Sequence, residues 1–117
     1  MSLRLANLRL GIDESEAALP AEAARVLGLP VDAVSSYRIL RKNLDARDRN
    51  DLAFVYTLEV RLAEDDSLVL GRLGNQRGLV QIEPYEDEPY EAPTPGGAPL
   101  AHRPLVVGSG PAGLAAA

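Results

Sequence analysis

The C-terminal stretch of the chain reads Pro104-Leu105-Val106-Val107-Gly108-Ser109-Gly110-Pro111-Ala112-Gly113-Leu114-Ala115-Ala116-Ala117. A short apolar, β-branched run leads into the pattern G-x-G-x-x-G, and small helix-forming residues follow it. This order predicts a buried strand, a tight glycine turn and the first turn of a helix. The stretch is therefore typical of the beginning of a dinucleotide-binding fold.

Each glycine of the motif has a physical role. We expect Gly108 to turn the chain off the strand, Gly110 to let a pyrophosphate approach the backbone, and Gly113 to let the helix pack on the strand. Pro111 suits the first helical turn, where its missing N–H leaves no bond unmade. The free N–H groups and the dipole at a helix start favour an anion. The expected pyrophosphate-binding residues are Gly108, Ser109, Gly110, Pro111, Ala112 and Gly113.

The motif carries a resemblance to a known class of protein. Residues 106–116 resemble the opening βα turn of FAD-dependent oxidoreductases of the two-dinucleotide-binding-domain type. In that class the sequence Pro-Ala-Gly-Leu is usual in FAD-binding domains rather than in NAD-binding domains. The stretch Arg41-Lys42-Asn43-Leu44-Asp45-Ala46-Arg47, leading into Phe54-Val55-Tyr56-Thr57, narrows the resemblance. It points to an uncharacterised bacterial FAD-dependent dehydrogenase family with an N-terminal ferredoxin-like domain.

The resemblance implies an oxidoreductase that uses FAD, and it is compatible with NAD(P)H as electron donor. It also implies the chain's own C-terminal flavin domain as a partner, but it supplies no substrate and no catalytic residue. A dinucleotide-binding half needs a βαβαβ unit and an acidic residue roughly 20 positions past the glycines. The sequence stops before either, so we expect an inactive fragment of a longer flavoprotein. Without neighbouring strands, the turn itself is expected to lack a fixed shape.

Composition excludes several classes of function. The 117 residues contain no cysteine, which excludes a disulfide scaffold, a thiolate metal site and a cysteine nucleophile. The net charge of -5 argues against nucleic-acid binding. No apolar run approaches the length of a membrane span, and the N-terminus lacks a secretory signal. We therefore expect a cytoplasmic protein with no membrane or nucleic-acid partner.

Apolar periodicity predicts the elements of the first part of the chain. Residues 2–12 are expected to form a strand, with a bulge near Ala6-Asn7 because the apolar phase changes there. Residues 19–27 predict a helix that begins with proline and ends before a glycine. Residues 35–44 and 52–62 predict an antiparallel hairpin, and the second of these strands has one wholly apolar face.

The second part of the chain completes the expected fold. Residues 64–74 are ambiguous between helix and loop, and residues 78–83 predict a last short strand. The fold class is therefore α+β, a ferredoxin-like β-α-β-β-(α)-β split sandwich. The expected domains are 1–85 for this auxiliary domain, 86–103 for a Pro/Gly-rich linker, and 104–117 for the truncated start of a Rossmann-like FAD-binding domain.

For the other candidate residues we prefer a structural explanation to a functional one. Tyr37 and Tyr56 are expected in the core, and His102 stands alone in the linker, without partners for a metal or a base. The acids near residue 14 are expected to be helix caps rather than a metal site; they are Asp13, Glu14 and Glu16. A basic cluster could meet an anionic group, but a solvated hairpin end explains it better; it comprises Arg38, Arg41, Lys42, Arg47 and Arg49.

Two other functions compete with the flavoprotein hypothesis. The first is a non-enzymatic ferredoxin-like module that binds a ligand or a protein and carries a flexible tail. The second is an RNA-binding module, because the ferredoxin-like fold hosts such domains. The acidic balance counts against RNA, and so does the placement of Phe54 and Tyr56 on the same face as the leucines.

Overall fold

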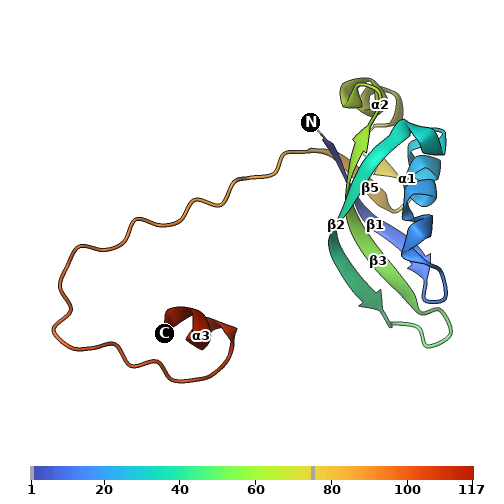
Figure 1. The fold of residues 1–117 in the computed structure, drawn as a ribbon. Helices are drawn as coiled ribbons and strands as arrows, with labels where there is room; N and C mark the ends of the chain where they lie inside the picture. The colour runs from blue at the N-terminus through green and yellow to red at the C-terminus, as the bar shows by residue number, and fades with distance from the viewer. Residues whose placement is uncertain (1, 75) are drawn as a thin grey trace.

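The computed structural model describes residues 2–74 and 76–117 and has an α+β fold. In chain order the elements are β1 Ser2–Gly11, the 3-10 turn η1 Glu16–Ala18, α1 Leu19–Leu27, the 3-10 turn η2 Val31–Ala33, β2 Val34–Asp45, β3 Ala53–Leu62, α2 Asp66–Leu73, β4 Gln76–Arg77, β5 Val80–Tyr85 and α3 Pro111–Ala116. The strands form one antiparallel sheet in the order β2-β3-β1-β5-β4. Figure 1 shows α1 lying against this sheet, and the segment after β5 carrying α3 away from it.

The change of apolar phase in β1 produces the expected bulge. Register with β3 shifts between Leu5 and Leu8, and Asn7 takes a left-handed φ of 66°. Asparagine tolerates this conformation better than most residues. The bulge returns Leu8 and Leu10 to the face that already holds Leu5, so all three side chains are buried.

The first helix begins and ends where its sequence signals lie. Ser15 caps η1 through its side chain, and Pro20 lies at the start of α1. Gly28 ends the helix with a left-handed φ of 66°, and its N–H bonds to the carbonyl oxygens of Ala24 and Arg25. This glycine also lies close to Arg77, since a Cβ on it would be 3.0 Å from the Arg77 guanidinium.

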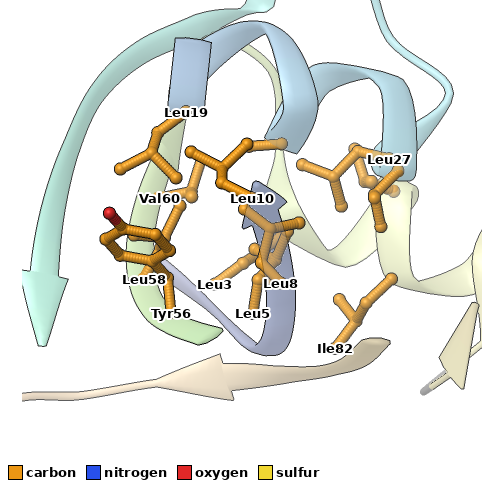
Figure 2. Packing of buried hydrophobic residues seen from close by; sticks show 13 residues of the cluster. Leu3, Leu5, Leu8, Leu10, Leu19, Leu27, Tyr56, Leu58, Val60 and Ile82 are labelled. Atoms are coloured by element: carbon orange, nitrogen blue, oxygen red, sulfur yellow. The ribbon is translucent and has the colours of Figure 1, made fainter. Parts of the chain in front are cut away.

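The core lies between one face of the sheet and the two helices α1 and α2. Figure 2 shows leucines of β1 and β3 meeting Leu19 and Leu27 of α1, with Tyr56 and Ile82 at the sides. Tyr56 is 1% exposed, which confirms its expected place in the core. None of the described helices covers the opposite face, which we call the open face and which carries polar strand side chains such as Glu59 and Arg61.

The structure corrects the expected place of Tyr37, shifts the bounds of the last strand and resolves one ambiguous stretch. Tyr37 is 39% exposed rather than buried, because β2 is the edge strand and α1 covers the middle of the sheet. The last long strand is Val80–Tyr85, later than 78–83, and it pairs with the short β4, which the sequence did not predict. The ambiguous stretch 64–74 contains α2, capped by the Asp65 side chain.

The apolar run before the glycine turn is not a buried strand in this structure. Residues 104–107 have no strand partner, and Leu105 and Val107 are 87% and 88% exposed. A single extended segment cannot bury both of its sides without neighbouring strands. Residues 86–103 likewise contain no helix or strand.

Candidate functional site

The glycine motif forms a compact turn that joins an extended segment to α3. Gly108 has a left-handed φ of 117°, a conformation that favours glycine. Gly110 is the N-cap of α3, and Pro111 follows it in the first helical turn. The Gly110 carbonyl oxygen accepts the first helical bond, from the N–H of Leu114 at 3.0 Å.

Gly113 is where the helix and the turn meet. A Cβ on this residue would collide with the carbonyl oxygen of Gly108 and would lie 3.0 Å from its carbonyl carbon. The same Cβ would be 3.6 Å from Val106 Cγ1, and Val106 is less exposed, at 40%, than its two neighbours. The turn therefore brings Gly113 against Gly108 in this structure, although no neighbouring strand pairs with residues 104–107.

Gly110 leaves the approach to the turn open. A Cβ at Gly110 would meet no atom of the described residues within 4 Å, so none of these residues fills the space in front of it. The first N–H groups of a helix have no partner within the helix, and here Pro111 has no N–H. The free donors at this helix start are therefore those of Ala112 and Gly113, and Ser109 lies beside them in the turn. This arrangement fits a small anion that approaches the backbone closely.

The basic residues of the sequence do not gather into one site. Lys42 lies on the helix side of the sheet, where its Nζ is 2.5 Å from Glu16 Oε1 and 4.3 Å from the centre of the Phe54 ring. Arg47 pairs with Asp45 in the hairpin turn. In residues 2–74 and 76–117, Arg41 and Arg49 make no ion pair. This distribution supports a solvated surface rather than an anion site.

Glu16 links the edge of the sheet to the start of α1. The Tyr56 hydroxyl donates to Glu16 Oε1 at 3.1 Å, and Lys42 donates to the same oxygen. These two donors, Lys42 first, hold the pKa of Glu16 below its usual value. Burial, together with the Glu16 carboxylate, raises the pKa of Tyr56. We had expected Glu16 to be a helix cap. Instead the Ser15 side chain caps η1, and Glu16 accepts hydrogen bonds from Lys42 and Tyr56.

A second polar centre lies on the open face around Glu59. This carboxylate is only 5% exposed, accepts a hydrogen bond from Ser2 Oγ at 2.8 Å, and pairs with Arg38 Nε at 2.7 Å. The Ser2 hydroxyl, followed by the charge of Arg38, lowers the pKa of Glu59. Sequence reasoning missed this group because Glu59 looked like an ordinary solvent-facing position of an alternating strand.

Neither a metal site nor a membrane-spanning helix is found among the described residues. Within the described residues no cluster of three His, Asp or Glu side chains is placed to hold a metal ion. His102 is exposed in the segment after β5. In the same part of the chain, no helix has the length and apolar character needed to cross a bilayer.

Comparison with known proteins places the chain in a family. It belongs to the family described as Domain of unknown function (DUF8436), which it matches over residues 2–61, from β1 into β3. It is also similar to a protein of Clostridium beijerinckii described as "Uncharacterized protein", with 27% identity over 117 residues. That alignment covers 100% of this chain and 21% of the relative. The chain therefore spans about a fifth of the length of this relative, and the linker and the glycine turn lie inside the aligned region.

Proposed function

We propose that the chain is the N-terminal part of an FAD-dependent oxidoreductase, in which an auxiliary domain precedes the FAD pyrophosphate turn. The observation that carries this proposal is the close contact of Gly113 with Gly108. A Cβ at Gly113 would collide with the Gly108 carbonyl oxygen, and Gly108 itself has a positive φ that favours glycine. A flexible Gly/Ala tail has no need of such a contact. The open space at Gly110 adds to it, because a pyrophosphate needs that approach to the backbone.

Each residue of the turn would have a different role in binding the cofactor. Gly108 would set the direction of the turn, Gly110 would give the pyrophosphate access, and the N–H groups of Ala112 and Gly113 would donate to its oxygens. FAD would supply the redox chemistry, with NAD(P)H as a compatible electron donor. The partners of the adenine, the ribose and the isoalloxazine would lie in sequence that this chain does not contain.

We also assign the auxiliary domain to the ferredoxin-like split sandwich. The order β1-α1-β2-β3-α2-β5 supports this assignment, with β4 as an added short strand. The spatial order β5-β1-β3-β2 supports it too, since the last strand pairs with the first and the hairpin lies on the other side. The domain would contact the flavin domain and would leave the redox chemistry to it.

A direct test of the proposed function uses the Clostridium beijerinckii relative, which is about five times as long as this chain. The full-length relative should purify with bound flavin, seen as visible flavin absorbance and identified as FAD after denaturation. A colourless relative that also fails to take up added FAD would refute the proposed function for this pair of proteins.

One observation favours the non-enzymatic alternative, a ferredoxin-like binding module. The family match and the packed core both lie before residue 86, and the glycine turn lies outside both. In that case the turn would bind nothing, and Gly110→Val would have no effect on any ligand. Flavin retention therefore discriminates between the two functions.

A further inference from the structure

The acidic segment after β5 does not leave the sheet freely. Asp87 is two residues past the end of the strand, and its Oδ2 lies 2.9 Å from Arg38 Nη2 on the edge strand β2. The Tyr85 hydroxyl also donates to Asp87 Oδ1 at 3.3 Å. Figure 1 shows the chain leaving the sheet beside the N-terminus, at the same end of the molecule.

Contacts with residues of the sheet orient the Arg38 side chain independently of Asp87. Its Nε bonds to the buried Glu59, and Glu59 is fixed in turn by Ser2, whose Oγ is 3.2 Å from the carbonyl oxygen of Tyr85. The contacts form a closed ring through β1, β3, β2 and the end of β5. Because the guanidinium is already oriented, the pair with Asp87 costs less side-chain entropy than an ordinary surface pair.

The neighbouring acids behave differently from Asp87. Glu88 makes no hydrogen bond or ion pair with any other described residue. The surface around Arg38 is a shallow hollow of about 180 Å³, lined by Ser36, Tyr37, Arg38, Glu59, Arg61 and Asp87. Arg38 lowers the pKa of Asp87, so this carboxylate is charged at neutral pH.

We propose that Arg38 and Asp87 form a latch that holds the start of the linker on the open face of the sheet. The surface is the part of the open face around Arg38, and the segment held there is the chain's own Glu86-Asp87, with Asp87 forming part of the wall of the hollow. The latch sets the direction in which everything after residue 87 leaves the domain. It moves the start of the free linker from residue 86 to residue 88, and it does not depend on the flavin proposal.

The latch is reversible, because Arg38 and Asp87 have side chains that are 52% and 64% exposed. Exposed pairs of this kind are weak and are screened by salt. Breaking the pair should therefore raise the open population by about two- to fivefold. The buried Glu59 would keep its place, because Ser2 and Arg61 still contact it.

The test uses the whole 117-residue chain and backbone amide relaxation by NMR. Asp87→Asn should raise the fast mobility of residues 86–88 toward that of residues 92–100, and high salt should do the same to the unmodified chain. Glu88→Gln is the matched control, with the same loss of charge one residue later, and should leave the mobility unchanged. On the sheet side, Arg38→Gln should act like Asp87→Asn, and Arg41→Gln should not.

The double variant Arg38→Gln/Asp87→Asn should be no more mobile than either single variant, because both changes remove the same contact. Equal mobility of residues 86–88 in the unmodified chain and in Asp87→Asn would overturn the latch. An equal effect of Glu88→Gln would overturn it as well, because a general loss of charge would then be the cause. Should Arg38→Gln unfold the domain, the Asp87 and Glu88 variants still decide the question.

Discussion

Leu58 lies at the centre of the core, and its truncation measures how much of the stability comes from the packing of α1 on the sheet. Its side chain is 0% exposed, and across the sheet it pairs with Leu5 of β1 and Ile39 of β2. Leu→Ala at a fully buried site costs about 2–5 kcal/mol, the upper end where the cavity cannot collapse. The free energy of unfolding of a domain of this size is about 4–13 kcal/mol in total, so Leu58→Ala should remove a large share of this stability.

The matched control is Leu44→Ala on the edge strand β2, where the leucine is 56% exposed. This variant should lose less than about 1 kcal/mol, because little apolar area returns to water. The assay is urea unfolding followed by far-UV circular dichroism, since the chain has no tryptophan for fluorescence. Leu58→Ala should also lower Tm by at least about 8 °C. Equal losses in the two variants would refute the described core.

Two further predictions concern the bulge and the buried carboxylate. Asn7→Ala should destabilise the domain by about 1 kcal/mol, because alanine is strained at a left-handed φ, whereas Asn7→Gly should leave the urea midpoint nearly unchanged; the opposite order would contradict the bulge. Glu59 has a lowered pKa in the folded state, so its charged form adds stability above the ordinary glutamate pKa and loses it as pH falls through the folded value. The stability lost on Glu59→Gln should therefore be largest at pH 7 and shrink below about pH 4 in urea titrations, and a loss independent of pH would contradict the role of the charge.

Local patterns in the sequence were enough to predict the α+β class and most of the helices and strands of residues 2–85. The phase change at Ala6-Asn7 located the bulge, Pro20 and Gly28 located the helix, and strict alternation located β3. These features depend on neighbouring residues, and the physics that produces them acts over a few positions. Strand β4 was not predicted, because a strand of two residues is too short to show a periodic pattern.

The parts that escaped prediction depend on contacts between distant segments. Tyr37 looked like a core residue, yet it lies on the edge strand β2 and is 39% exposed, because α1 packs mainly on the middle of the sheet. Glu59 is buried because Ser2 and Arg38 meet it from two other strands, and no local pattern records that register. Asp87 looked like one acid among several in a linker, until the strand order placed Arg38 beside it.

The glycine turn is an intermediate case. The spacing of its glycines predicted a turn at Gly108 and the helix that starts after Gly110, and Gly108 makes this turn with a positive φ of 117°. The sequence did not indicate that Gly113 would seat against Gly108 in the absence of partner strands. The family match over residues 2–61 does not extend to the turn.

The most direct test of the flavoprotein proposal is flavin absorbance after gel filtration of three samples. They are the 117-residue chain, the longer flavoprotein of which we propose it is the start, and that protein with Gly110→Val. The chain alone should elute colourless, because the turn offers only a few donors, and the longer protein should elute yellow. Gly110→Val should remove the flavin, because a branched side chain fills the approach of the pyrophosphate, and residues 2–85 should still fold. A yellow 117-residue chain, or a Gly110→Val protein as yellow as the unmodified one, would contradict the assignment of this turn to the FAD pyrophosphate.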